Sequence, residues 1–195
     1  MEFLFLFTAF IIPFAWTPGP INVTLAAVGT ASGFTKALPL ILGINMAFLL
    51  QAIAMGMGMG TLFELYPLLY EIIRYTGALY LLYLAYKMLT LRIGSREIQL
   101  HFWNGILLSL LNPKVYMTHI VMYAQFTQKG QTLSGVLLLS LMATGFFFIG
   151  NSGWCLFGAT LRRFMENEVF FRIYKYFFAL LLVGVAGYLV WGSMQ

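Results

Sequence analysis

Apolar runs long enough to cross a membrane fill most of this 195-residue sequence. A membrane-spanning helix needs about 20 mostly apolar residues. Hydrophobic residues make up 61% of the chain and charged residues only 9%, whereas a soluble domain has about 25% charged residues. The sequence therefore predicts an all-α integral membrane protein. Six transmembrane helices are expected at Phe3–Val28, Ala37–Gly60, Leu65–Leu89, Phe102–Phe126, Leu133–Thr160 and Tyr174–Trp191.

The third of these stretches is the most polar, because Glu71 and Arg74 lie in its first turns. Residues three apart lie on the same face of a helix, so this acid and this base are expected to pair.

The cations are distributed unevenly between the two predicted ends of the bundle. One end holds the loops after the first, third and fifth helices, and these loops or their flanks carry Lys36, Lys87, Arg92, Arg96, Arg162, Arg163, Arg172 and Lys175. At the other end Lys129 is the loop cation, with Arg74 in a helix flank. Cytoplasmic loops of membrane proteins are enriched in Lys and Arg, which places the first end in the cytoplasm and both termini outside.

Proline interrupts the first and fourth helices. The first contains Thr17-Pro18-Gly19-Pro20-Ile21-Asn22, and the fourth contains Asn112-Pro113-Lys114. Proline breaks a helix interior but is favoured at the first helical position, after an N-cap residue such as Thr or Asn. We therefore expect new half-helices with Thr17 and Asn112 as caps and Pro18 and Pro113 as first residues. A plain proline kink is the alternative.

The two interruptions divide the chain into matching halves, residues 1–90 and 100–195, each with three helices. An odd number of helices in each half makes the halves run in opposite directions through the membrane. This is the pattern of an inverted repeat within a single transmembrane transporter domain, with a binding site where the broken helices meet. Helix N-termini favour an anionic group at such a site.

Lys114 is the most informative single residue. About 12 residues into its helix, it is expected roughly 18 Å deep, near the middle of the membrane. A cation there costs about 2.5–3.5 kcal/mol, so it should face a cavity or a partner. It could bind the carboxylate of a substrate, or it could bond carbonyl groups freed by the break at Pro113.

Further polar residues fall within the predicted membrane segments. Asn22, Asn45 and Asn151 are expected to help bind a substrate, although Asn often only links helices. His119 is a candidate proton carrier, because its ordinary pKa lies near neutrality. The glycine pair Gly184 and Gly187 is expected to serve helix packing.

The sequence lacks a phosphate-binding glycine loop, metal-ligand spacing and a nucleophile–base set. Cys155 is the only cysteine, which excludes a dithiol redox pair. The net charge of +5 is attributed to loop orientation rather than to nucleic-acid binding. We therefore expect a protein that is not an enzyme, uses no cofactor or metal and binds no nucleic acid, with a small molecule and the lipid bilayer as its partners.

At its two breaks the sequence resembles the lysine-exporter (LysE/RhtB-type) family of transporters. The matching segments are TPGPIN at Thr17–Asn22, the aromatic run at Gly77–Lys87 and LLNPK at Leu110–Lys114. The resemblance implies a secondary transporter in the bacterial inner membrane that exports amino acids or related small metabolites, driven by a proton or ion gradient and working as a homo-oligomer. It also implies functional roles for Pro18, Gly19, Pro20, Asn112, Pro113 and Lys114.

One departure from the family pattern bears on the substrate. Many members carry acidic residues within the second and fifth helices, where this chain has Asn45, Gln51 and Asn151. This favours a neutral or apolar amino acid over a basic one. The alternatives are a metal-ion exporter on the same scaffold, which would need clustered ligands, and a non-transporting membrane subunit.

Overall fold

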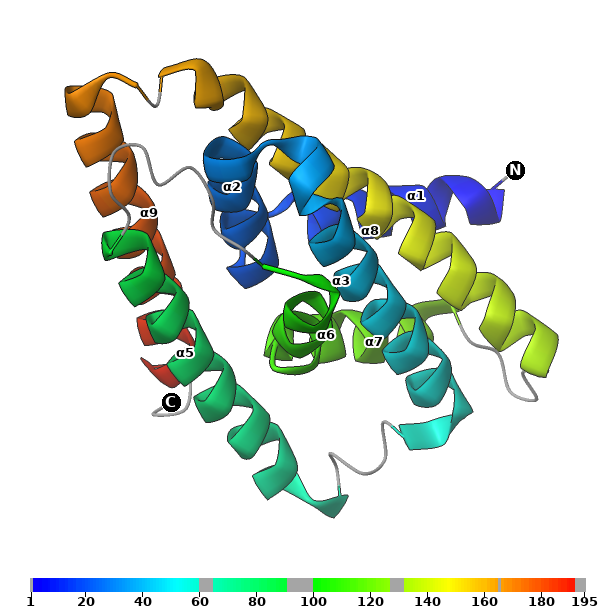
Figure 1. Ribbon diagram of the computed structural model, residues 1–195. Coiled ribbons are helices and arrows are strands. Elements are labelled where there is room, and N and C mark those ends of the chain that lie inside the picture. The colour runs from blue at the N-terminus through cyan, green and yellow to red at the C-terminus, as the bar shows by residue number, and fades with distance from the viewer. Residues whose placement is uncertain (1, 60–64, 91–99, 127–131, 165, 192–195) are drawn as a thin grey trace.

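The computed structural model of the protein describes residues 2–59, 65–90, 100–126, 132–164 and 166–191. Throughout these ranges the secondary structure is helical (Figure 1). The helices are α1 (Glu2–Trp16), α2 (Pro20–Ser32), α3 (Phe34–Ala54), α5 (Pro67–Leu89), α6 (Phe102–Leu110), α7 (Pro113–Phe126), α8 (Leu133–Leu161) and α9 (Glu168–Trp191). A π-helical turn, η1 (Met55–Met59), extends α3, and a 3₁₀ turn, η2 (Arg162–Phe164), extends α8.

The observed bounds agree closely with the expected segments. The fourth predicted segment has both of its predicted boundaries, because α6 begins at Phe102 and α7 ends at Phe126. The predicted end of the second segment, Gly60, lies outside the described residues. The sixth begins at Glu168 rather than at Tyr174. The first turns of α9 contain the charged residues Glu168 and Arg172. The predicted boundary followed the apolar stretch and therefore began later than the helix does.

In the described part of the chain, three helices are long and apolar enough to cross a membrane, namely Phe34–Gly58, Leu133–Leu161 and Glu168–Gly187. Together α1 and α2 meet the same test across a bend of 59°. The α5 helix carries Glu71, Arg74 and Lys87, and α6 and α7 have only 9 and 14 residues. A count of six spans therefore stays a prediction.

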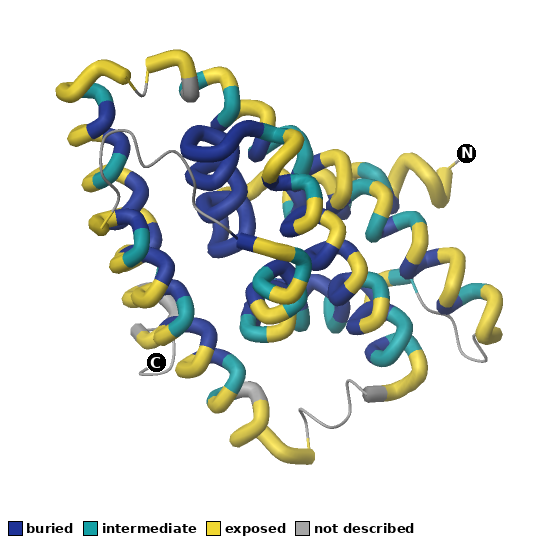
Figure 2. Tube along the Cα trace, viewed as in Figure 1, coloured by how far each residue is buried: buried dark blue, intermediate teal, exposed yellow. Residues whose placement is uncertain are grey.

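Glycines let two pairs of helices touch through their backbones. A Cβ atom at Gly29 of α2 would lie 2.1 Å from the Cys155 carbonyl oxygen, and one at Gly158 of α8 would lie 2.0 Å from the Ala26 carbonyl oxygen. The α3–α6 contact is built in the same way, with Gly43 against the Phe102 carbonyl and Gly105 against that of Leu40. Small residues permit such close helix packing in membranes. Burial follows from it: all 13 residues of α2 are buried (Figure 2).

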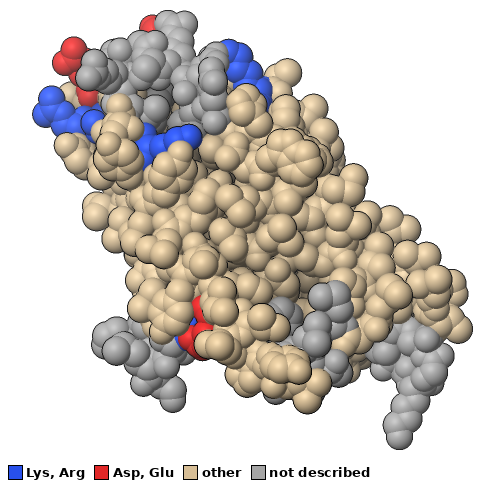
Figure 3. Space-filling view, turned by 60° about the horizontal axis from the view of Figure 1, so that its bottom comes forward, with Lys and Arg blue, Asp and Glu red and all other residues tan. Residues whose placement is uncertain are grey.

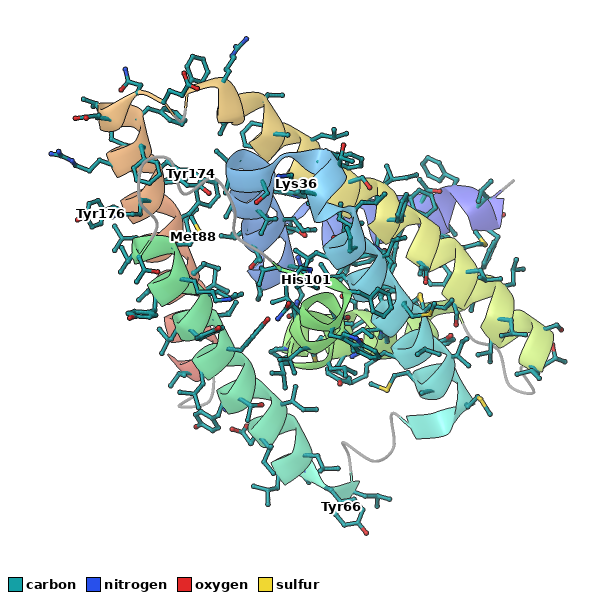
Figure 4. All side chains as sticks on the ribbon, viewed as in Figure 1. Lys36, Tyr66, Met88, His101, Tyr174 and Tyr176 are labelled. Atoms are coloured by element: carbon teal, nitrogen blue, oxygen red, sulfur yellow. The ribbon has the colours of Figure 1, made fainter. Side chains whose placement is uncertain are left out.

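The α5 and α9 helices pair with each other at one side of the molecule (Figure 1). Tyr174 of α9 points toward α2 (Figure 4), and its hydroxyl donates to the Ala27 carbonyl at 2.6 Å. The predicted packing role of Gly184 and Gly187 finds no contact among the described residues, where a Cβ atom at either position would have no neighbour within 4 Å.

Charged side chains lie mainly at one end of the molecule (Figure 3). Lys36 lies in the first turn of α3 and Lys87 in the last turn of α5. Arg163, Arg172 and Lys175 lie around the α8–α9 junction, at that same end. The Arg92, Arg96 and Lys129 side chains lie outside the described residues. The predicted pairing of Glu71 with Arg74 is confirmed by an ion pair between their side chains.

Candidate functional site

The break between α1 and α2 lies two residues later than predicted. Thr17 directly follows α1: its backbone N–H donates to the Pro13 carbonyl at 2.8 Å, and its hydroxyl donates to the same oxygen. Gly19 is the extended residue before α2, and Pro20 takes the first helical position. The predictions that Thr17 caps the new helix and that Pro18 is its first residue are therefore wrong. A residue before proline avoids helical geometry, so the second proline, Pro20, determines where α2 begins.

The break between α6 and α7 lies where it was predicted. Pro113 is the first residue of α7, and Asn112 caps the helix by accepting the Lys114 backbone N–H on Oδ1 at 3.1 Å. The Tyr116 hydroxyl donates to the Leu110 carbonyl at 2.9 Å and so satisfies a group at the end of α6. Both interruptions are thus true helix restarts rather than plain kinks.

Lys114 connects the two breaks. Its Nζ donates to the Thr17 carbonyl at 2.8 Å. The side chain passes directly over Gly19, where a Cβ atom would lie 3.2 Å from Lys114 Cδ and 3.3 Å from Nζ. The ammonium thus bonds a carbonyl freed by the other break, not one freed by Pro113 as the alternative interpretation held.

Asn22 satisfies further groups at the first break. Its Nδ2 donates to the Ala15 carbonyl at 3.0 Å and to the Thr17 carbonyl at 2.9 Å. The Thr17 oxygen therefore accepts from both Asn22 and Lys114. Because both amide hydrogens of Asn22 can be used in this way, its role here is to hold the end of α1 in place.

Two cavities adjoin Lys114. The larger, of about 670 Å³, lies between the α1–α2 break and the middle of α9. Its lining comprises Thr17, Pro18, Gly19, Pro20, Lys114, Phe177, Leu180, Leu181, Gly184 and Val185. Apart from the break itself and Lys114, this lining is apolar, and none of these residues is acidic.

The smaller cavity, of about 10 Å³, lies between the two breaks. Its lining comprises Phe14, Gly19, Pro20, Ile21, Asn22, Asn112, Lys114, Val115, Thr118, Phe147 and Asn151. Gly19, Pro20 and Lys114 line both cavities, so the Lys114 side chain stands at the boundary between an apolar space and a more polar one.

The predicted site residues are brought together only in part. Pro18, Gly19, Pro20, Asn22, Asn112, Lys114 and Asn151 line one or both cavities, as does Thr17, and Pro113 begins the helix that carries Lys114. Asn45 lines neither, but its Oδ1 accepts from Asn151 Nδ2 at 3.5 Å. His119 lines neither and is fully buried, with its ring 4.4 Å from that of Phe48.

The sequence did not indicate the α9 part of the site. Phe177, Leu180, Leu181 and Val185 are apolar residues on a membrane helix, and they carry no local signal that separates cavity lining from lipid contact. Gly184 was interpreted from the sequence as a packing residue, whereas the structure places open space beside it.

Within the described part of the chain, His, Cys, Asp and Glu side chains form no group of three that could hold a metal ion.

The chain matches the family model described as LysE type translocator over residues 12–193. It is 27% identical over 173 residues to the cysteine/O-acetylserine efflux protein of Salmonella paratyphi A, covering 87% of this chain and 88% of that protein. The protein of the same name from Escherichia coli K12 is 26% identical over 157 residues, covering 78% of this chain and 80% of that protein. No solved structure matches the chain. The family is one of translocators and not of enzymes, and because the family model covers nearly the whole sequence, this chain belongs to the LysE type translocators.

Proposed function

We propose that this protein exports neutral or apolar amino acids, or related small metabolites, from the bacterial cytoplasm by alternating access. Its membership of the translocator family supports transport, and its relatives are named for the efflux of cysteine and O-acetylserine, which are small neutral amino acids. The apolar wall that α9 adds to the larger cavity suits a side chain without charge.

The proposed architecture has six transmembrane helices in two inverted repeats, residues 1–90 and 100–195, that form one transporter domain. In this scheme α3 corresponds to α8 and α5 to α9. Helices that lie beside a two-fold axis contact their own counterparts, and α3 packs on α8 while α5 packs on α9. A helix restart at a proline in each half adds support.

The cation-rich end is proposed to face the cytoplasm of the inner membrane, with both termini outside. The gathering of Lys36, Lys87, Arg163, Arg172 and Lys175 at one end supports this orientation. A homo-oligomer is also proposed, on the family resemblance alone.

The central step of the proposal is binding of the substrate carboxylate to Lys114. The observation that carries it is that the Lys114 ammonium lies at the boundary of both cavities and, among the described residues, bonds a neutral carbonyl and no acid. A carboxylate is a stronger acceptor for an ammonium than a carbonyl oxygen is. A substrate that enters the larger cavity can therefore take the place of the Thr17 carbonyl and loosen the link between the two breaks.

The test is transport of labelled amino acids by purified protein in proteoliposomes. Lys114→Gln should lower flux at least about tenfold, because a hydrogen bond to a charged group contributes about 1.5–3 kcal/mol and each 1.4 kcal/mol is about tenfold. Lys175→Gln removes a cation from the charged end and should retain wild-type flux. Wild-type flux in a folded Lys114→Gln protein would reject the assignment.

Proton coupling through His119 is a second part of the proposal. Among the described residues neither of its ring nitrogens has a hydrogen-bond partner, although the side chain is fully buried. A buried imidazole without partners is costly in a static fold, so it is expected to gain one during the transport cycle.

A further inference from the structure

One buried acceptor in the smaller cavity has no partner. Asn151 of α8 is 1% exposed and lines this cavity, and among the described residues nothing donates a hydrogen bond to its Oδ1. Leaving a buried acceptor unsatisfied costs about 1–3 kcal/mol, so native proteins rarely do so without a reason. A ligand that brings a donor would remove that cost.

Asn45 determines which atom Asn151 presents. The Asn45 Nδ2 donates to the Ile41 carbonyl of its own helix at 2.8 Å, which turns the Asn45 oxygen toward α8. That oxygen accepts from Asn151 Nδ2 at 3.5 Å. Because the nitrogen of the Asn151 amide is directed at Asn45, its oxygen is left for another partner, and that partner must be a hydrogen-bond donor.

Several other polar groups of the smaller cavity are already engaged in hydrogen bonds. Asn112 Oδ1 accepts the Lys114 N–H, the Thr118 hydroxyl donates to the Lys114 carbonyl at 2.7 Å, and Asn22 donates to the end of α1. The volume of about 10 Å³ is the room that a single water molecule needs, and an ammonium group is of similar size. The space therefore suits one small donor group and not a whole amino acid.

We propose that the smaller cavity is the α-ammonium subsite of the transporter, with Asn151 Oδ1 as the acceptor. This rests on the proposed function and deepens it. In an α-amino acid the carboxylate and the ammonium are attached to the same carbon. Lys114 lines both cavities, so a carboxylate bound to it can place the ammonium in the smaller cavity while the side chain remains in the larger one.

The subsite also restricts the charge of the substrate. Its acceptor is a neutral amide, and no acidic residue lines either cavity among the described residues. A zwitterion is balanced there, because its carboxylate meets the Lys114 ammonium. An amine without a carboxylate would add an uncompensated cation beside Lys114. The site therefore selects for the α-amino acid group itself, with Asn151 as the specificity residue and Asn45 as its positioning residue.

The test compares L-cysteine with 3-mercaptopropionate, which lacks only the amino group, as competitors for binding to the purified protein under reducing conditions. Wild type should prefer L-cysteine by at least about tenfold, the value of one hydrogen bond to a charged group. Asn151→Leu should weaken the binding of L-cysteine but not that of 3-mercaptopropionate, so the two affinities should become similar. Asn45→Leu should narrow the preference less, since it acts through Asn151. Ser140→Ala, a buried polar residue of the same helix outside both cavities, should keep the wild-type preference.

Asn151→Asp provides a second measurement if the leucine variant does not fold. It retains an acceptor and adds a negative charge, so it should keep the preference for L-cysteine and should also bind cysteamine, which has the amine without the carboxylate, more tightly than wild type. An unchanged preference in Asn151→Leu, or unchanged cysteamine binding in Asn151→Asp, would overturn the subsite even if the protein transports cysteine. If wild type neither binds nor transports amino acids, the proposed function is overturned as well.

Discussion

The two helix breaks resemble each other in sequence but differ in what they contribute to the site. At the α1–α2 break the end of α1 presents the Ala15 and Thr17 carbonyls, and α2 behind it is buried along its whole length. At the α6–α7 break Asn112 caps the new helix and Lys114 extends from its first turn. The first break supplies carbonyl acceptors and the second supplies the Lys114 ammonium as donor, so the hydrogen bond between them joins the two breaks.

The helices that follow the two breaks, α2 and α7, also differ in how far they are buried. The α2 helix is held against α8 by glycine contacts to the backbone, whereas α7 has Met117 exposed and Lys114 half-buried. We infer that the first break is the fixed side of the site and the second is the side that responds to the substrate. The variants below test this difference, from the largest expected effect to the smallest.

Gly29→Val should prevent folding of the protein. A Cβ atom at Gly29 would lie 2.1 Å from the Cys155 carbonyl oxygen, and backbone cannot move aside cheaply. Overpacking of this kind typically costs about 1–3 kcal/mol or more. Size-exclusion chromatography and thermal unfolding in detergent give the readout, with Gly145→Val on α8, where a Cβ has open space, as the control. A stable Gly29→Val protein would show that α2 is not held rigidly against α8, and it would contradict the assignment of the first break as the fixed side of the site.

His119→Phe should abolish the dependence of transport on a pH gradient. Phenylalanine fills a similar space against Phe48 but cannot bind a proton. Accumulation against a substrate gradient should be lost, while downhill flux in proteoliposomes without a pH gradient should remain. If the variant still uses the pH gradient as wild type does, protons do not pass through His119.

Gly19→Ala should lower transport several-fold without loss of fold. The new Cβ would lie 3.2 Å from Lys114 Cδ and 3.3 Å from Nζ, so the side chain must shift by a few tenths of an ångström, and we expect its bond to the Thr17 carbonyl to weaken. Losing that charged hydrogen bond is expected to cost about 1.5–3 kcal/mol at most. The test is to measure flux and melting temperature for Gly19→Ala and for the control variant Gly145→Ala. Wild-type flux would mean that the position of Lys114 is not critical.

Asn112→Ala should have the smallest effect, about 1 kcal/mol of stability, because it removes one N-cap. Chemical denaturation in mild detergent measures the change, and Asn104→Ala removes a comparable cap contact to the His101 N–H at the start of α6. A loss much greater than that of Asn104→Ala would show that the second break is as rigid as the first.

The ease of prediction differed between the two breaks for a physical reason. Asn-Pro at residues 112–113 offers a single cap followed by a single proline, so the start of α7 was predictable. Thr17-Pro18-Gly19-Pro20 offers two prolines at which a helix could begin, and the structure uses the second, Pro20, with Gly19 before it. The segregation of cations could be read from loop composition, because membrane insertion itself acts on loop charge.

The cavity itself could not be predicted. Its α9 wall consists of Phe177, Leu180, Leu181 and Val185, which look like any lipid-facing stretch until the helix is placed beside the break. The pairing of Asn45 with Asn151 likewise joins residues from opposite halves of the chain. Such contacts depend on tertiary packing and leave no local pattern.

The bond from the Tyr174 hydroxyl to the Ala27 carbonyl has a mechanical consequence. It ties α9 to the buried α2 helix near the cation-rich end, whereas Val185 of the cavity wall lies 11 residues further along, roughly 16 Å away at 1.5 Å per residue. With Tyr174 as pivot, a tilt of about 10° would swing Val185 by roughly 3 Å while scarcely shifting Phe177. The helix would then act as a lever that widens the larger cavity at its Val185 end and keeps it narrow near Phe177.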